Sequence, residues 1–346
     1  MKKRFLPIVS FLLVLVLLAG LQNLLMPKYM SDIVEGALIA EYYDNAGDND
    51  VIFIGDCEVY ENISPIRLYE QYGIASYIRG SAQQLIWQSY YLMEETFRYE
   101  TPKVMVFNVL SMMYDEPQNE AYNRMTLDGM RWSSSKVKSI QASMTDEERE
   151  KDAFLSYVFP ILRYHTRWKE LQKDDFTYYF NKRQISHNGY YMRVDVNPVK
   201  REPTVKPLAD YRFSENCYDY LDKMRELCEE NGTKLVLFKA PSIYPVWYDE
   251  WDEQIGDYAK EHDLLYVNAL AHLEEIGIDW QTDTYDEGLH LNLSGAEKMS
   301  DYLGNILKSE TDLPDRRNDK AVAGKWEDKI AYYYAEKEKQ TKELEK

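Results

Sequence analysis

The stretch Val51-Ile-Phe-Ile-Gly-Asp-Cys-Glu58 decides the fold of this chain. A short apolar run that stops at Gly-Asp is typical of a parallel strand buried on both faces. Cys57 then stands where the strand gives way to a turn. Because side chains that carry chemistry in open α/β sheets gather at the carboxyl ends of strands, we interpret Cys57 as a candidate nucleophile. The alternative is a purely packing role, since free cysteines are often buried as small apolar residues.

A second stretch, Tyr285-Asp-Glu-Gly-Leu-His-Leu-Asn292, supplies a base for this nucleophile. It holds the only histidine that acidic residues flank within a glycine-containing loop, and a sulfur or oxygen nucleophile needs such a base. A helix that begins at Cys57 would also lower the pKa of its thiol. We therefore pair Cys57 with His290. The other histidines are interpreted as surface or packing residues, with a substrate contact as the alternative for the second: His165, His187, His262 and His272.

Strands and helices alternate on both sides of a long insertion, which predicts a parallel sheet with helices on its faces. The expected strands are Val51–Gly55, Ala75–Arg79, Lys103–Val109, Lys234–Lys239 and Leu264–Val267. The expected helices are Pro65–Tyr72, Gln83–Tyr99, Asn216–Asn231, Asp252–His262 and Ser294–Leu307. Gly232 is expected to terminate the third of these helices, and Ser294 to cap the last.

The chain of 346 residues exceeds a typical single domain, so we expect one large domain with an insertion. Residues 50–110 and 212–308 would form the α/β domain. Residues 111–211 would form a largely helical cap, because insertions of this length usually make lids or binding surfaces. Residues 29–49 are expected to be a stalk. Residues 309–346 are a charged tail, predicted either as a surface helix or as a frayed end.

Residues 1–28 begin with the basic Met1-Lys-Lys-Arg-Phe5 and continue with an apolar run from Leu6 to Met26. About 20 residues are needed to cross a bilayer, so the run is long enough to form a transmembrane helix. A cleavable signal peptide is the alternative, but no small-x-small cleavage site follows the run. Basic residues before the run place the N-terminus in the cytoplasm. We therefore expect an uncleaved, single-pass membrane anchor with an extracytoplasmic catalytic domain.

The composition bounds the partners and the cofactors. A formal net charge of −18 argues against nucleic acid or anionic lipid as a partner of the folded part. Cys217 and Cys228 lie eleven residues apart on a helical pattern, which separates them by about 16 Å and forbids a disulfide. Cys57 is then a free thiol. The sequence has neither the spacing of a metal site nor a glycine-rich phosphate loop, so we expect no metal and no cofactor.

The Gly-Asp that precedes Cys57 and the acid-x-x-His pattern that ends at His290 resemble the SGNH/GDSL hydrolase superfamily, with Cys57 at the position of the family's serine. The resemblance implies a three-layer α/β/α sandwich, flavodoxin-like, around a five-stranded parallel sheet. It also implies a triad of Cys57, His290 and an acid. The family's aspartate stands three residues before the histidine, which is Glu287 here. We favour Asp286, which a one-residue expansion of the loop would bring into place, and keep Glu287 in reserve.

The same resemblance implies an oxyanion hole. In the family its donors are the backbone N–H of the nucleophile, a glycine after the second strand and an asparagine after the third. Gly80 and Asn108 match these in order and location, although the fuller Gly-x-Asn-Asp block is absent around Asn108. The Gly-Asp-Cys-Glu58 motif, together with the N-terminal anchor, is similar to the DltD/alginate O-acetylation branch. Its members work with membrane-bound O-acyltransferases on extracellular polymers.

These features predict a membrane-anchored acyl esterase or acyltransferase that acts on acylated glycans or polymers of the cell envelope. A thioester at Cys57 would suit transfer to a sugar hydroxyl, and the aromatic cap would stack on sugars. The alternative is a non-catalytic SGNH-fold subunit that binds a membrane-bound O-acyltransferase, with Cys57 marking the loss of the serine. A third option is a simple esterase or lipase that turns over soluble esters without a partner.

Overall fold

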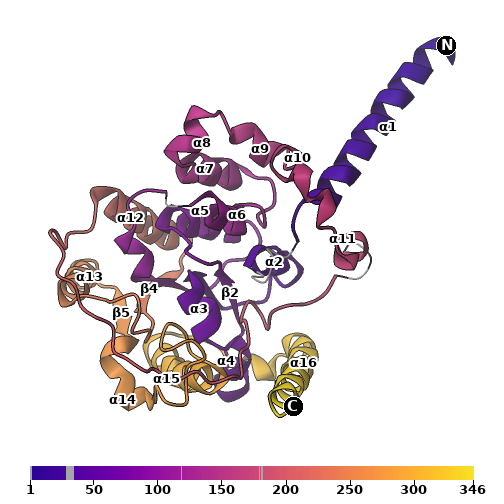
Figure 1. The fold of residues 1–346 in the computed structure, drawn as a ribbon. Helices are drawn as coiled ribbons and strands as arrows, with labels where there is room; N and C mark the ends of the chain where they lie inside the picture. The colour runs from indigo at the N-terminus through magenta and orange to yellow at the C-terminus, as the bar shows by residue number, and fades with distance from the viewer. Residues whose placement is uncertain (1, 29–34, 118, 179, 181) are drawn as a thin grey trace.

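The computed structural model describes residues 2–28, 35–117, 119–178, 180 and 182–346. Its centre is a five-stranded parallel sheet with the order β2-β1-β3-β4-β5 (Figure 1). The strands are β1 (Val51–Gly55), β2 (Ser76–Gly80), β3 (Val104–Asn108), β4 (Lys234–Lys239) and β5 (Leu265–Asn268). The predicted α/β fold with a five-stranded parallel sheet is confirmed.

Helices cover both faces of this sheet. One face carries α4 (Pro65–Tyr72), α15 (Leu293–Glu310) and α16 (Lys320–Leu344), and the other carries α5 (Ile86–Thr96), α12 (Glu215–Glu230) and α13 (Asp249–Glu261). The short α3 (Cys57–Asn62) follows β1, while η4 (Ala269–His272) and α14 (Leu273–Ile276) follow β5. Three layers result, as in other doubly wound folds.

The three central strands consist mainly of apolar residues because both of their faces are buried. On β1, Val51 and Phe53 enter the core under α4 and α15, whereas Ile52 and Ile54 enter the core under α5 and α12. Each strand thus contributes alternate residues to two cores, which explains why the sequence shows short continuous apolar runs rather than an apolar–polar alternation.

Two helix boundaries show how local hydrogen bonds set the ends. Gly232 follows α12 with a φ of 66°, the left-handed conformation expected of a helix terminator. Ser294 is predicted to cap the last helix, but the cap is Asn292, whose side chain accepts a hydrogen bond from the Gly295 backbone N–H. Asn ranks with Ser as a capping residue, so the sequence pattern alone does not separate these two positions.

The insertion between β3 and β4 has two parts. The first part is helical as far as Thr177 and contains η2 (Val109–Met113), α6 (Glu120–Leu127), α7 (Ser134–Ser143), α8 (Asp146–Glu150), α9 (Phe154–Val158), α10 (Ile161–Tyr164), η3 (His165–Lys169) and α11 (Lys173–Thr177). In the second part, residues 182–214, the structure has only an isolated bridge between His187 and Tyr190.

That second part closes the free edge of β2 rather than adding to a cap. Ile78 N donates to Asn188 O at 3.0 Å, and Asn188 Nδ2 donates to Ser76 O at 3.0 Å. A Cβ at Gly189 would lie only 2.1 Å from Ile78 O, so glycine is needed for this close approach. Covering the edge in this way removes a site of strand-to-strand aggregation.

The N-terminal helix α1 (Lys2–Leu25) projects from the rest of the molecule (Figure 1). The window Pro7–Leu25 has a mean hydropathy of 2.4 and is only 6% buried. Its length and composition fit a membrane anchor, and a signal sequence has the same properties.

Part of the expected stalk packs on the domain instead. Residues 29–34 of the stalk lie outside the described residues, but α2 (Glu35–Glu41) and η1 (Tyr42–Asp44) are seen. Tyr42 is fully buried, and its ring centroid lies 4.0 Å from the guanidinium carbon of Arg79. Residues 35–44 therefore belong to the α/β domain.

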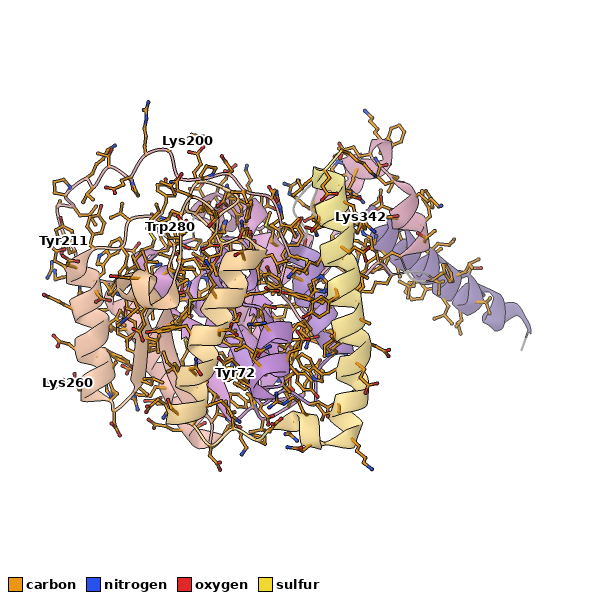
Figure 2. All side chains as sticks on the ribbon, turned by 90° about the horizontal axis from the view of Figure 1, so that it is seen from below. Tyr72, Lys200, Tyr211, Lys260, Trp280 and Lys342 are labelled. Atoms are coloured by element: carbon orange, nitrogen blue, oxygen red, sulfur yellow. The ribbon has the colours of Figure 1, made fainter. Side chains whose placement is uncertain are left out.

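After η5 (Arg316–Asn318), most of the charged tail forms the long helix α16. Side chains of this helix are part of the core. Trp326 is 2% exposed and stacks on Tyr69 with a centroid distance of 4.2 Å. Tyr333 is buried and its hydroxyl group bonds Glu297 at 2.9 Å. Figure 2 shows α16, with Lys342 near its end, running along the body of the domain. Of the two alternatives for the tail, the helix is the one that the structure has.

Candidate active site

Cys57 lies at the topological switch point of the sheet. The connection after β1 leads to β2 on one side, and the connection after β3 leads to β4 on the other side. Open α/β sheets bind ligands between two such connections. Cys57 is the first residue of α3, and its side chain is partly accessible. Asp56 caps this helix, because its Oδ1 accepts a hydrogen bond from Glu58 N at 3.1 Å.

Two glycines allow α3 to lie this close to the sheet. Gly55 ends β1 and pairs in register with Gly80 of β2. A Cβ at Gly55 would come within 2.7 Å of the Asn108 Cβ, and one at Gly80 within 3.2 Å of Asp56 O. Gly80 therefore stands next to the turn that carries Cys57, where the predicted oxyanion donor belongs. Its close packing is by itself also a sufficient reason for a glycine at this position.

A folded-back loop presents His290 to α3. Thr284 and Leu291 form an isolated antiparallel bridge, and the Thr284 hydroxyl donates to His290 O at 2.8 Å. The loop is tied to α3 because Leu291 N donates to Asn62 Oδ1 at 2.7 Å. Asn62 is fully buried, and its amide also donates to Ser242 Oγ at 3.1 Å. The position of His290 is thus fixed from two sides.

Asp286 holds the imidazole in one orientation. Its Oδ2 lies 2.6 Å from His290 Nδ1, and its Oδ1 accepts from the His290 backbone N–H at 2.8 Å. Glu287 has a φ of 64° and points away, with its Oε1 2.5 Å from Lys200 Nζ on the exposed surface. The structure thus brings Asp286, rather than Glu287, to His290. The bond at Nδ1 leaves Nε2, which is buried without a hydrogen bond among the described residues, to exchange a proton.

A second carboxylate, which sequence reasoning missed, reaches the same imidazole. Glu61 lies one helical turn after Cys57 and is buried, with Oε2 3.7 Å from His290 Nδ1. The Tyr285 hydroxyl donates to the same Glu61 oxygen, and its ring is nearly parallel to the imidazole at a centroid distance of 6.0 Å. The regular i, i+4 spacing of Cys57 and Glu61 on a helix is the sequence signal that places the two on one face.

A buried ion pair includes Glu58, the residue that follows Cys57 in α3. The carboxylate of Glu58 is 2.8 Å from Lys239 Nζ, and both side chains are essentially inaccessible. Lys239 Nζ also donates to Ala240 O at 2.8 Å. Lys239 was predicted only as the last residue of a strand. The available signal was a lysine that ends an apolar run at the carboxyl edge of the sheet, where a buried cation needs an anionic partner.

Asn108 lies at this edge, but its amide group is engaged. Nδ2 donates to Asp56 Oδ1 and to Glu58 Oε2, both at 3.0 Å. Both amide hydrogens therefore serve carboxylates, while Oδ1 is buried without a hydrogen bond among the described residues. Asn108 stands beside the switch point as predicted. In this arrangement it has no free donor for an oxyanion.

The pKa of Cys57 and the pKa of His290 are both raised from their ordinary values. Burial raises the pKa of the Cys57 thiol to about 11, with His290 lowering it and Asp56 and Glu61 raising it. Burial opposes charge on His290, but Cys57, Glu61 and Asp286 outweigh it and hold the pKa of His290 well above its usual value. The expectation of a thiol pKa lowered by a helix N-terminus is wrong, because desolvation and nearby negative charge exceed the effect of a six-residue helix.

Asp56 itself is affected by its neighbours. Burial raises its pKa to about 7, and the negative charge of Glu58 adds to this, whereas hydrogen bonds from the Glu58 N–H and the Asn108 amide oppose it. Near neutral pH the cap residue Asp56, in the turn between β1 and α3, thus changes between a neutral and a charged form. The proton on Asp56 relieves repulsion between two buried carboxyl groups.

A cavity of about 650 Å³ adjoins the loop that carries His290. Ile243 and Val199 line it, and both would contact a Cβ at Gly288, within the loop. Ile243 N donates to Gly288 O at 3.0 Å. Lys200 and Trp280, which also line the cavity, lie at one end of the molecule in Figure 2. Most of the remaining lining is apolar: Pro203, Val205, Val246, Trp247, Leu270 and Leu273.

The other two cysteines and His187 lie outside this group of residues. All three cysteines are free, with Cys217 and Cys228 buried in the core under α12. His187 is buried and lies against the ring of Tyr332 of α16 at 4.8 Å, which gives it a packing role. Within the described parts of the chain, no group of three or more His, Cys, Asp or Glu residues is arranged to hold a metal ion.

Comparisons with known proteins add little to this geometry. No family model and no curated protein matches the chain. Among solved structures, a provisionally assigned acylhydrolase from Bacteroides fragilis is similar, with 11% identity, a TM-score of 0.37, and coverage of 78% of this chain and 94% of that one. A GDSL-like lipase from Bacteroides thetaiotaomicron has 12% identity, a TM-score of 0.33, and coverage of 75% and 88%. Similarity at this level assigns neither a family nor an activity to the chain.

Proposed function

We propose that this protein is an acyl esterase or acyltransferase in which Cys57 is the nucleophile, His290 the base and Asp286 the residue that orients His290. The observation that carries the proposal is the 2.6 Å contact between Asp286 Oδ2 and His290 Nδ1, in a loop bonded to the helix that Cys57 begins. An acid, an imidazole and a nucleophile in this order serve acyl transfer on several unrelated folds.

The chemistry follows from the proton positions. His290 Nε2 takes the thiol proton while Cys57 Sγ forms a bond to the acyl carbonyl carbon. The tetrahedral intermediate collapses as the C–O bond of the ester breaks, and the imidazolium returns its proton to the leaving alcohol. A water or sugar hydroxyl then attacks the thioester, with His290 again acting as base; the C–S bond breaks, and the imidazolium returns the proton to Cys57 Sγ. Asp286 stabilises the imidazolium throughout.

The substrates that fit best are acyl esters of cell-envelope glycans or polymers, handled outside the membrane into which α1 inserts. A thioester is a more reactive acyl donor than an oxygen ester, which favours transfer to a hydroxyl group over simple storage of the acyl group. The apolar cavity beside the His290 loop is a suitable place for an acyl chain. A membrane-bound O-acyltransferase would supply or receive the acyl group.

A non-catalytic subunit of such an acyltransferase system is the second candidate function. Two observations favour it: the thiol pKa of about 11, and the engagement of both Asn108 amide hydrogens by carboxylates. An enzyme would normally keep a donor free for the oxyanion, since the loss of one costs about 3 kcal/mol of transition-state stabilisation. In this alternative the site would bind an acylated polymer without cleaving it.

The deciding experiment uses the full chain in detergent with p-nitrophenyl acetate as probe. We expect release of p-nitrophenol and, after acid quenching, an acetyl group on the peptide that contains Cys57. Cys57→Ala should abolish both, whereas Cys228→Ala, at a buried thiol, should retain both if it remains folded. Equal turnover by wild type and Cys57→Ala would overturn the nucleophile assignment. Absence of turnover and adduct in the wild type would favour the non-catalytic subunit.

A further inference from the structure

Large apolar side chains are exposed along one part of the insertion, from α9 to just after α11. Each of the six is 50% to 93% exposed: Leu155, Phe159, Leu162, Trp168, Phe176 and Phe180. The chain leaves the helical conformation at Phe159, between α9 and α10, so these side chains are presented by several short elements. Isolated exposed apolar residues are normal on a protein surface, but a group of this size within 26 residues of chain indicates a surface that another apolar phase covers.

The elements that carry several of these side chains lie next to the C-terminal end of α1. Figure 1 shows α10 and α11 on either side of the base of α1, and α1 makes close backbone contacts with α10, η3 and α11. Arg167 of η3 donates to Leu25 O, the last residue of α1, at 3.2 Å. The same guanidinium lies 2.9 Å from the carboxylate of Asp175 in α11. The segment is thus bonded to the point where the apolar helix ends.

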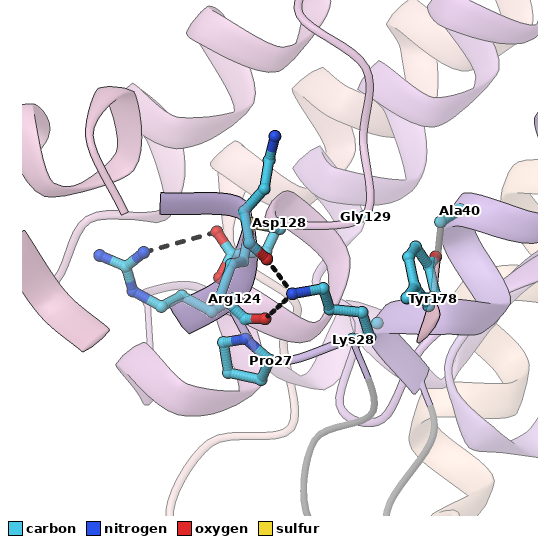
Figure 3. Close-up of a pocket in the computed structure, with 10 residues that line it drawn as sticks. Pro27, Lys28, Ala40, Arg124, Asp128, Gly129 and Tyr178 are labelled. Atoms are coloured by element: carbon cyan, nitrogen blue, oxygen red, sulfur yellow. Dashed lines mark hydrogen bonds and ion pairs between the residues drawn. The ribbon is translucent and has the colours of Figure 1, made fainter. Parts of the chain in front are cut away.

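The C-terminal end of α1 also borders a cavity of about 180 Å³. The end of α1, α2 and α6 line this cavity (Figure 3). Lys28 points back along the chain and its Nζ donates to Met26 O at 2.8 Å and to Leu24 O at 3.3 Å. Since Lys28 satisfies carbonyl groups at the C-terminal end of the helix, α1 ends at a defined place against the domain.

The charge of this segment differs from that of the chain as a whole. Residues 154–180 hold four Lys and Arg against three Asp and Glu, a net charge of +1, whereas the chain carries −18. Some of these cations pair with carboxylates elsewhere, as Arg163 does with Glu120. The exclusion of lipid that follows from total charge therefore does not extend to this segment. Aromatic side chains flanked by Lys and Arg are typical of the membrane–water interface.

We propose that residues 154–180 form a lipid-contacting surface that rests in the interfacial layer of the same bilayer that α1 enters. Trp168 and the phenylalanines would occupy the boundary between headgroups and acyl chains, with Lys169 and Lys173 at the phosphates. The domain would then be attached at two places rather than by one helix. This fixes the tilt of the domain, and hence the direction in which the edge of the sheet that carries Cys57 faces. The inference rests on the membrane anchoring in the proposed function, but not on the catalytic role of Cys57.

The test uses the full chain in vesicles of phosphatidylcholine and phosphatidylglycerol that contain a lipid with a photoactivatable group near the headgroup. Illumination is followed by digestion and mass-spectrometric mapping of lipid adducts. We expect adducts on peptides of α1 and on peptides of residues 154–180. Peptides with exposed apolar residues elsewhere, such as Tyr99, Tyr334 and Leu344, are internal controls and should carry none.

A matched pair of variants makes the result specific. Replacing Phe159, Trp168 and Phe176 by serine should lower the adduct yield on residues 154–180 several-fold and leave that on α1 unchanged. Replacing Tyr99, Tyr334 and Leu344 by serine should change neither, and the thermal unfolding of each variant reports on folding. Adducts on α1 with none on residues 154–180 would overturn the inference and leave a protein partner as the occupant of the surface. Absence of adducts from α1 would instead refute the membrane anchor.

Discussion

The two sides of the candidate site are built in opposite ways. On the histidine side, formed by Glu61, Tyr285, Asp286 and His290, a carboxylate holds the imidazole at 2.6 Å and the loop is bonded to α3. On the carboxylate side, formed by Asp56, Glu58, Asn108 and Lys239, the groups bond one another. On the histidine side, the hydrogen bond to Asp286 orients a base. On the carboxylate side, the donors and acceptors are paired with one another.

This difference indicates which step limits the chemistry. A prepared base can remove a proton, but an anion that develops next to Asp56 and Glu58 meets negative charge, and the Asn108 amide is already engaged by these carboxyl groups. The single cation on that side, Lys239, is already neutralised by Glu58 at 2.8 Å. We therefore expect both deprotonation of Cys57 and stabilisation of an oxyanion to be difficult unless substrate or a partner protein rearranges the carboxylate side.

The largest effect should come from removing the base on the histidine side. His290→Ala eliminates the proton acceptor, so we expect ester turnover to fall by roughly 10²- to 10⁴-fold. Alkylation of Cys57 by iodoacetamide should also slow, because His290 is the group that lowers the thiol pKa. His272→Ala, at an exposed histidine, is the control. An alkylation rate that does not change would show that the two side chains do not exchange a proton.

The next largest effect should be on stability, from the carboxylate side. Lys239→Met leaves the Glu58 carboxylate buried and unpaired, which should lower the free energy of unfolding by about 3–5 kcal/mol. Lys342→Met removes an exposed partner of Glu338 and should cost at most about 1 kcal/mol. Urea unfolding of the full chain in detergent measures both. If the ion pair is the cause, adding Glu58→Gln to Lys239→Met should restore part of the loss.

A matched pair of substitutions distinguishes the two candidate acids. Asp286→Asn removes the negative charge at His290 Nδ1 and should lower ester turnover on the order of 10²-fold, because the imidazolium loses its partner. Glu287→Gln, whose side chain faces Lys200 in solvent, should leave turnover nearly unchanged. The ratio of the two rates under identical conditions is the measurement. Equal losses, or a larger loss in Glu287→Gln, would contradict the assignment of Asp286.

The sequence was sufficient to predict the parallel sheet. Runs such as Val51–Gly55 and Lys234–Lys239 are short, apolar and bounded by polar residues, so strand positions follow from local patterning. The stalk and the tail were harder to interpret. Tyr42 and Trp326 are buried only because distant elements cover them, and a local charge pattern carries no information about such tertiary contacts.

Within the site, residue types were easier to predict than their partners. Cys57, His290 and Asp286 were proposed from the sequence motifs around them, and the structure brings Asp286 to His290. The engagement of Asn108 and the burial of Glu58 with Lys239 depend on side-chain directions across β1, β3 and β4, which spacing does not determine. The thiol pKa was predicted in the wrong direction because desolvation is a property of the packed site, not of the helix start.

The smallest predicted effect concerns the charge of Asp56 and sharpens the contrast between the two sides. Asp56→Asn keeps an acceptor for the Glu58 N–H at the helix start, since Asn caps as well as Asp, but removes the negative charge beside Cys57. The thiol pKa should move below about 11, so Cys57 should be alkylated a few times faster at pH 8. Asp301→Asn, at a surface ion pair, should not change this rate.

The same substitution has a consequence for stability that can be checked separately. In the folded chain Asp56 keeps its proton up to a pKa of about 7, against an ordinary value of 3.8. The folded state therefore binds more protons than the unfolded state between about pH 4 and pH 7, and the contribution of Asp56 to the free energy of unfolding falls as pH rises through that range. Asp56→Asn should flatten this part of the pH profile measured by urea unfolding. A profile identical to that of the wild type would mean that Asp56 is ionised at all these pH values, and the carboxylate side would then carry more negative charge than we infer.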